Sequence, residues 1–181
     1  MAQLLGTNAA PQWVKHEHAD VAVLRLAPSP QLVAKHLQKR FLPFSVLIDD
    51  LRAPPRDLEL TVFGFPMELG VKEHFSALTM HSRASSGLLE LQGPNEKKSI
   101  YFVLEKPGIG GYSGAPVFDR SIYKHGLMTS TGSGTKCYGL IKGTISDDTG
   151  GKLALVVPSA FLAETIMKAE KQSSAKPTSN N

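Results

Sequence analysis

Apolar and polar residues alternate over many short stretches of the chain, and Gly, Pro, Asn or Asp residues separate these stretches. A period of two is the pattern of a half-buried β-strand, and frequent turn residues are typical of antiparallel sheets. We therefore expect about nine short strands. They are Asp20–Leu26, Phe44–Ile48, Leu58–Phe63, Ser76–His81, Gly87–Leu91, Ser99–Leu104, Pro116–Phe118, Tyr138–Ile145 and Lys152–Val157.

Two stretches have a helical period instead. Gln31–Arg40 predicts a short helix, and Ser159 is placed to cap a second one near the end of the chain. Asp147–Gly151 predicts a hairpin turn between the last two strands. After Lys171 the chain is polar and has no core residue, so residues 172–181 are expected to be disordered. The apolar face of the second helix would contain Leu162, Ile166 and Ala169.

This order of elements predicts an all-β protein with a carboxy-terminal helix. The chain has 181 residues, of which 41% are hydrophobic and 20% charged, which is enough for one real core or for two small barrels. The net charge of +4 lies partly in the tail and is too weak for nucleic acid, which needs clustered Lys and Arg residues. We expect no nucleic-acid partner.

The start of the chain, the length of its apolar runs and its single cysteine bear on secretion, membrane insertion, disulfides and metal binding. The start of the chain does not have the pattern of a signal peptide, and no run of eighteen apolar residues exists, so we expect no membrane partner. The single cysteine, Cys137, forms no internal disulfide and has no neighbouring cysteine that would indicate a metal site. We expect a cytoplasmic protein without a metal or a cofactor.

The segment that indicates chemistry is Gly110–Asp119, with the sequence GGYSGAPVFD. A nucleophilic serine must lie on a tight turn between small neighbours. In this chain, Gly111 precedes the pair Tyr112-Ser113 and Gly114 follows it. The amides of Gly111 and Ser113 can then converge on one oxyanion, because glycine tolerates unusual dihedral angles. Taken alone, a glycine-rich stretch around serine is also ordinary turn chemistry.

The same segment resembles the nucleophile loop of trypsin-like (chymotrypsin-fold) serine peptidases, especially their bacterial intracellular and Do-like members. Four further stretches agree with this family and come in its order: the His18–Leu24 aspartate strand, the Gly64–Pro66 corner, the Tyr138–Gly143 strand and the Val156–Pro158 entry to the last helix. The resemblance implies a double β-barrel. Its first barrel would be truncated to a remnant with its linker at 1–50, followed by the second barrel and helix at 51–171 and the tail at 172–181.

The resemblance also implies roles for individual residues. Ser113 would be the nucleophile, Asp20 the triad carboxylate, and Gly111 and Ser113 the oxyanion hole. The wall of the substrate pocket would lie at Leu140, Ile141, Lys142 and Gly143, and its floor near Lys106–Ile109. Neither segment contains an acidic residue, so we expect the substrate to present a small or apolar side chain there.

The catalytic histidine of the family has no counterpart in the chain. Only nineteen residues precede Asp20, and no Ala-Ala-His occurs. His16 and His18 flank the aspartate strand, but a useful base must engage both Asp20 and Ser113.

Three interpretations follow. The chain is a truncated serine endopeptidase of peptides or proteins, whose first barrel is completed by a partner or a missing amino-terminal segment. Alternatively, it is an inactive pseudo-peptidase that binds peptides or proteins, or a structural barrel with a coincidental Gly-Tyr-Ser-Gly turn.

Overall fold

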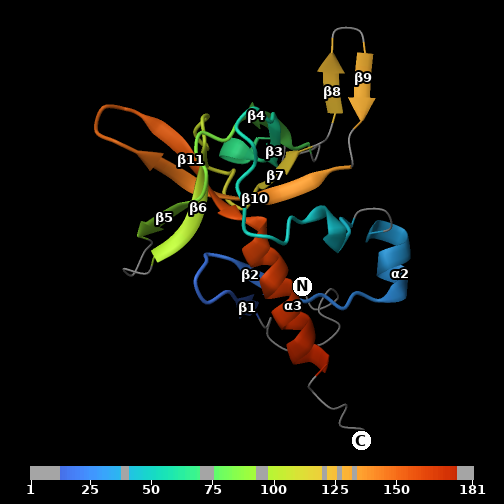
Figure 1. Ribbon diagram of the computed structural model, residues 1–181. Helices are drawn as coiled ribbons and strands as arrows, with labels where there is room; N and C mark the ends of the chain where they lie inside the picture. Colours follow the sequence, from blue (N-terminus) through green and yellow to red (C-terminus); the bar gives the residue numbers. More distant parts are fainter. Residues whose placement is uncertain are drawn as a thin grey trace, which may run out of the picture.

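A computed structural model describes most of the chain, which forms a large β-sheet with a carboxy-terminal helix (Figure 1). The predicted all-β class with a terminal helix is therefore confirmed at this level. The described residues are 13–37, 41–69, 76–92, 98–119, 122–125, 128–131 and 134–174. Of these, the side chains of 36–37, 122–125, 128–131 and 174 are outside the description.

Within these ranges, seven antiparallel strands form the large sheet in the order β4-β3-β7-β10-β11-β6-β5. The strands β10 and β11 extend together as a long hairpin (Figure 1). The predicted turn at its tip is confirmed, because the Asp147 amide donates to the Gly151 carbonyl at 3.1 Å. The strands are β3 (Leu60–Gly64), β4 (Leu78–Ser82), β5 (Leu89–Gln92), β6 (Lys98–Leu104), β7 (Pro116–Asp119), β10 (Lys136–Ser146) and β11 (Lys152–Pro158).

The sheet curls so that the segment after β4 reaches the end of β6. Ala84 forms an isolated antiparallel bridge with Leu104. Beside it, the Ser85 amide donates to the Val103 carbonyl at 2.9 Å, and the Glu105 amide donates to the Arg83 carbonyl at 3.0 Å. These bonds form a short seam, not a continuous ladder, so the sheet is not a closed barrel.

The remaining elements lie around this sheet. The strands β1 (Trp13–Lys15) and β2 (Ala22–Leu24) form a separate antiparallel pair, as do β8 (Ile122–His125) and β9 (Met128–Thr131). The helix α3 spans Ser159–Ser174. Short helical turns occupy Pro30–Leu32 (α2), Val33–Leu37 (a π-helical turn), Phe44–Val46 and Pro66–Glu68 (both 3₁₀ turns).

Several predicted elements need correction. The expected strand Phe44–Ile48 is a 3₁₀ turn that follows Pro43, and only Leu47 makes a bridge, to Cys137. The expected helix Gln31–Arg40 is one α-helical turn continued by a π-helical turn to Leu37, and 38–40 lie outside the described residues. The pairs β1–β2 and β8–β9 include strands that the alternation did not predict.

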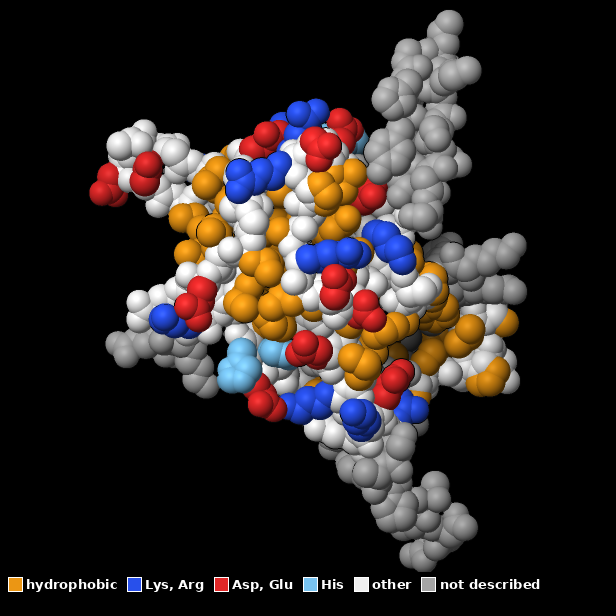
Figure 2. Space-filling model, in the orientation of Figure 1, with side chains coloured by type: hydrophobic (Ala, Val, Ile, Leu, Met, Phe, Trp, Pro, Cys, Tyr) orange, Lys and Arg blue, Asp and Glu red, His pale blue; other side chains and the backbone are white. Residues whose placement is uncertain are grey.

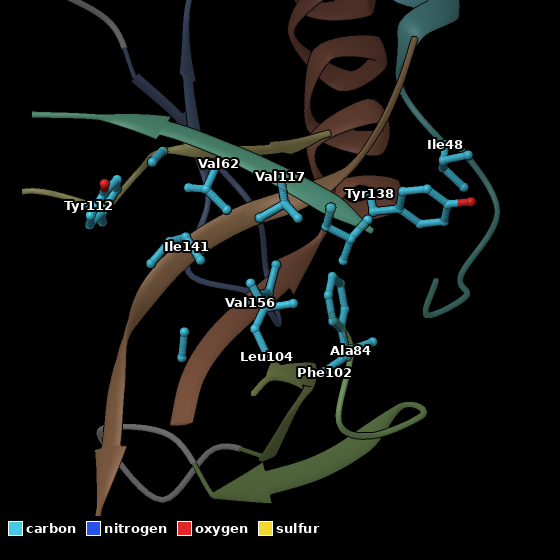
Figure 3. Packing of buried hydrophobic residues seen from close by; sticks show 13 residues of the cluster. Ile48, Val62, Ala84, Phe102, Leu104, Tyr112, Val117, Tyr138, Ile141 and Val156 are labelled. Atoms are coloured by element: carbon cyan, nitrogen blue, oxygen red, sulfur yellow. The ribbon is translucent and has the colours of Figure 1, made fainter. Parts of the chain in front are cut away.

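The main core lies inside the curled sheet. Alternate residues of each strand point into it, so Ala154 and Val156 of β11 pack on Phe102 and Leu104 of β6. Figure 3 shows this cluster running from Tyr112 at one end to Ile48 at the other. Its buried members are Ile48, Leu60, Val62, Ala84, Phe102, Leu104, Tyr112, Ala115, Val117, Tyr138, Ile141, Ala154 and Val156.

A second core joins the aspartate strand to the helix α3. Val21 packs with Tyr101, Val157 and Phe161, and its exposed fraction is 8%. Val21 is therefore covered by the chain's own strands and last helix. Ala19 and Val21 belong to one cluster with Tyr101 of β6 and Val157 of β11, and β1 and β2 contact α3 (Figure 1).

The helix α3 begins at Ser159 as predicted, but the hydroxyl of Ser159 has a different role from a cap. It donates to the carbonyl of Ile48 at 2.7 Å and to that of Cys137 at 2.8 Å. The serine therefore ties the start of α3 to β10 and to the segment after Val46. The helix continues through Ser174, so residues 172–174 are not a disordered tail, and 175–181 lie outside the described residues.

Replacing Ser159 by Ala should lower the free energy of unfolding by about 1–3 kcal/mol, because the buried Ile48 carbonyl loses its hydroxyl donor. Urea unfolding followed by circular dichroism measures this change. Ser146→Ala is the matched control, because Ser146 is exposed at the far end of β10, and its effect should be within about 0.5 kcal/mol. Equal effects of the two substitutions would contradict the role given to the Ser159 hydroxyl.

Candidate functional site

Ser113 lies on a tight turn between β6 and β7. The Tyr112 amide donates to the Ile109 carbonyl at 3.0 Å, and the Ala115 amide donates to the Tyr112 carbonyl at 2.8 Å. Tyr112 and Ala115 are buried, whereas Ser113 between them is exposed. The turn therefore anchors its neighbours in the core and presents the serine hydroxyl at the surface.

Two glycines give this turn its shape. Gly111 has φ = +101° and Gly114 has φ = +82°, which is the left-handed region that favours glycine. A Cβ atom on Gly111 would also overlap with the carbonyl group of Phe65 and lie 2.8 Å from the Cα atom of Pro66. The conformation next to Ser113 therefore depends on glycine at position 111.

The corner Gly64–Pro66 packs against the Ser113 turn and forms hydrogen bonds with it. The Phe65 amide donates to the Gly111 carbonyl at 3.4 Å, and the Met67 amide donates to the Gly110 carbonyl at 2.9 Å. Gly64 leaves room for the ring of Tyr112, since a Cβ atom on Gly64 would lie 2.5 Å from its Cδ1 atom. Two segments that are far apart in the sequence thus pack backbone against backbone.

The strand β10 holds the other side of the turn. The Gly114 amide donates to the Ile141 carbonyl at 2.6 Å, and the Ile141 amide donates to the Ala115 carbonyl at 2.9 Å. The next residue, Lys142, lies at an irregularity in the pairing of β10 with β11. The hydroxyl of Ser113 donates to the Lys142 carbonyl at 3.2 Å.

Two amides of the turn are free to bind a ligand. Within the described part of the chain, the amides of Gly111 and Ser113 donate to no backbone or side-chain acceptor. Both residues are exposed, so their amides face no burial penalty in the unliganded protein. Such donors are what an oxyanion hole requires.

Asp20 and Ser113 are linked through one residue, Lys142. The ammonium group of Lys142 forms an ion pair with the carboxylate of Asp20, while its main-chain carbonyl accepts the Ser113 hydroxyl. The side chain of Lys142 is 19% exposed and that of Asp20 is 70% exposed. The structure therefore brings both predicted residues to the same strand, with a lysine as the direct partner of the carboxylate.

No described histidine side chain contacts Ser113 or Asp20. The Nδ1 atom of His16 accepts the amides of His18 and Ala19, and its Nε2 atom contacts a Glu164 oxygen at 3.0 Å. The ring of His18 packs on that of His16. Of the other four histidines, His81 contacts Thr61 and Glu59, and the side chains of His36, His74 and His125 lie outside the description.

The predicted pocket segments lie next to each other. The Thr144 hydroxyl donates to the Gly108 carbonyl at 2.6 Å, which joins the end of Lys106–Ile109 to β10. Ile141 is buried in the main core, so its side chain does not line a surface pocket. Leu140, Lys142 and Gly143 are half-buried and remain near Ser113.

Tyr112, next to Ser113, has a pKa that its surroundings shift. Burial raises the pKa of the Tyr112 phenol, so Tyr112 stays neutral beside Ser113 at physiological pH. Among the described residues, no three His, Cys, Asp or Glu side chains are placed to hold a metal ion. Basic and acidic side chains are interspersed on the face shown in Figure 2.

Sequence reasoning missed the role of Lys142 as the partner of Asp20. It had placed Lys142 only in the wall of the substrate pocket. The two residues are separated by 122 positions, and neither the alternation of β10 nor its motif indicates which side chain meets Asp20. The one signal in the sequence is a lysine that directly follows the apolar residues Leu140 and Ile141 within a predicted strand.

A cavity of about 630 Å³ lies elsewhere, between β2 and α3. Val23 and Ile166 are among the residues that line it, and none of them belongs to the Ser113 turn. No helix in the described ranges is long and apolar enough to cross a membrane. No family model, no curated protein and no solved structure matches the chain.

Alanine substitutions at three glycines of the turn should separate strain from steric overlap. Gly110→Ala should change the free energy of unfolding by less than about 0.5 kcal/mol, because the site is open. Gly114→Ala should cost about 1–2 kcal/mol from its positive φ alone. Gly111→Ala should cost more than Gly114→Ala, because its Cβ atom also meets the Phe65 carbonyl. Urea unfolding measures all three, and the predicted order is wrong if Gly111→Ala is the milder of the last two.

Proposed function

We propose that this chain carries the serine-bearing part of a trypsin-like serine endopeptidase, with Ser113 as nucleophile. One observation supports this most: Ser113 is exposed on its turn, and the amides of Gly111 and of Ser113 itself have no acceptor in the described residues. In acyl transfer, Ser113 Oγ forms a bond to the substrate carbonyl carbon and gives its proton to a base. The two amides would stabilise the negative charge on the carbonyl oxygen.

The position of Asp20 supports the same proposal. In a triad, a carboxylate orients the base that takes the proton of serine. Asp20 and Ser113 both contact Lys142, so a carboxylate and the proposed nucleophile meet at the same residue of β10. That base is absent among the described histidine side chains near Ser113, so the chain by itself should be a poor catalyst.

The finer fold proposal is a trypsin-like barrel. It is supported by the curl of the seven-stranded sheet and by the seam between Ala84 and Leu104. It is also supported by the meeting of three stretches that resemble the family: the Gly64–Pro66 corner, the Ser113 turn and β10. A first barrel, supplied by a partner or by a further segment, belongs to the same proposal.

A second candidate is a pseudo-peptidase that binds peptides or proteins. The pairing of Asp20 with Lys142 favours it, because an occupied carboxylate is not free to orient a base. The hydroxyl of Ser113 is likewise bonded to a carbonyl, which takes no proton from it. For both candidates we propose a cytoplasmic protein that acts on peptides with a small or apolar side chain.

Turnover of casein by the purified chain should be barely above background, and it should be the same in Ser113→Ala. Loss of the base in a triad costs on the order of a million-fold in turnover, because serine hydroxyl is a weak nucleophile. A fluorophosphonate probe should nevertheless label Ser113 slowly, and intact mass of the protein measures the adduct.

These two measurements, together with a measurement of peptide binding, separate the candidates. Slow labelling that is lost in Ser113→Ala and weakened in Gly111→Ala supports a peptidase site. Peptide binding without any labelling of Ser113 supports the binding module. Robust casein cleavage that depends on Ser113 would mean that a base is present after all, and His18→Ala and His16→Ala would identify it.

A further inference from the structure

The antiparallel pair β1–β2 has a free edge along β2. The His16 amide donates to the Val21 carbonyl at 2.9 Å, and the register of the two strands places these residues opposite each other. Hydrogen-bonded and non-hydrogen-bonded pairs alternate along an antiparallel ladder, so the main-chain groups of Ala22 and Leu24 point away from β1. Within the described part of the chain, these outward groups have no hydrogen-bond partner. The edge of β2 therefore offers donors and acceptors to a further strand.

The cavity of about 630 Å³ lies beside this edge. Val14 is the direct partner of Val23, but no described residue of β1 lines the cavity. The cavity therefore lies on the free side of β2, between this strand and α3, which contact each other (Figure 1). Its lining comes from the β2 segment and α3: Val23, Arg25, Ile166, Ala169, Glu170 and Ser173.

This lining combines an apolar part with an unpaired cation. Val23 and Ile166 are half-buried and Ala169 is buried, so a ligand in the cavity contacts apolar side chains. Arg25 is exposed, and among the described residues its guanidinium forms no ion pair, not even with Glu170 of the same cavity. The cavity therefore suits a ligand that has an apolar group and, at a short distance from it, a carboxylate.

We propose that the edge of β2 and this cavity form a docking groove for an extended acidic peptide, which adds to β2 as an antiparallel strand. In strand addition, main-chain hydrogen bonds supply affinity, and pockets for alternate side chains supply specificity. The free edge and the cavity provide these two parts side by side. The groove contains no residue of the Ser113 turn, so the inference goes beyond both candidate functions and does not depend on either.

The ladder determines which side chains of the peptide enter the groove. Hydrogen bonds to Ala22 and Leu24 make the positions opposite Val23 and Arg25 non-hydrogen-bonded pairs, in which facing side chains lie closest. Alternate residues of a strand share a face, so both of these peptide side chains lie on the face that borders the cavity. An antiparallel peptide therefore has an acidic residue opposite Arg25 and, two positions later, an apolar residue opposite Val23.

The experiment titrates the isotope-labelled full chain with a short synthetic peptide. The peptide alternates threonine and valine, and one aspartate takes the place of the valine two positions before another valine. Saturable shifts of the amide resonances of Ala22, Leu24 and Ile166 are expected. A peptide with lysine in place of the aspartate should bind about five- to tenfold more weakly, because it places two cations opposite each other. The variant Arg25→Glu should reverse this preference.

Two controls separate the groove from general effects of charge and of the peptide. Lys15→Glu makes the same change of charge on the other face of the β1–β2 pair, because Lys15 lies opposite Ala22 and not opposite Val23. It should change both affinities by less than about twofold. N-methylation of the peptide amides that face Ala22 and Leu24 should abolish binding, whereas N-methylation of the amides between them should not.

Several outcomes would overturn the inference. One is the absence of saturable shifts in the wild-type chain, and another is an equal effect of Arg25→Glu and Lys15→Glu. Equal loss of binding for both N-methylated peptides would mean that the peptide does not add as a strand. Shifts confined to Gly111, Ser113 and Gly143 would place the peptide at the Ser113 turn, which would support the proposed function and reject the docking groove.

Discussion

Beyond Leu140, β10 no longer pairs with β7, and its hydrogen-bonding groups are taken by the turn that carries Ser113. This change of partner depends on the backbone of β10 lying close to the backbone of β11. A Cβ atom on Gly139 would overlap with the carbonyl of Val157, so only glycine lets β10 approach β11 there. The same strand therefore completes the core on one side of this point and positions the candidate site on the other.

The strands with clear alternation could be predicted from sequence, and the short ones could not. The predicted ends of Lys152–Val157 and Ser99–Leu104 lie within one residue of β11 and β6, because each is an apolar run of strand length that begins after a polar segment. The segment Phe44–Ile48 has the composition of a strand, but Pro43 starts a 3₁₀ turn that leaves only a bridge at Leu47. Local pattern does not specify which segments find a partner strand.

The candidate site also has one part that the sequence predicts and one part that it does not. The exposed turn at Ser113 follows from its own glycines, so its sequence was informative. The Asp20–Lys142 pair joins positions 122 residues apart, and only the packing of the whole chain determines it. The proposed peptidase and the proposed binding module differ in what this one pair does, because both use the same turn.

The packing of β1 and β2 on α3 has a consequence for how the chain folds. The Asp20 segment is held by the last helix, through Val21 on Phe161, His16 on Glu164 and Glu17 on Lys168. Contacts between the first and last described elements form late, because closing so long a loop is entropically costly. During synthesis, Asp20 therefore waits for α3 to emerge, and the candidate site is assembled only after residues 159–174 have been made.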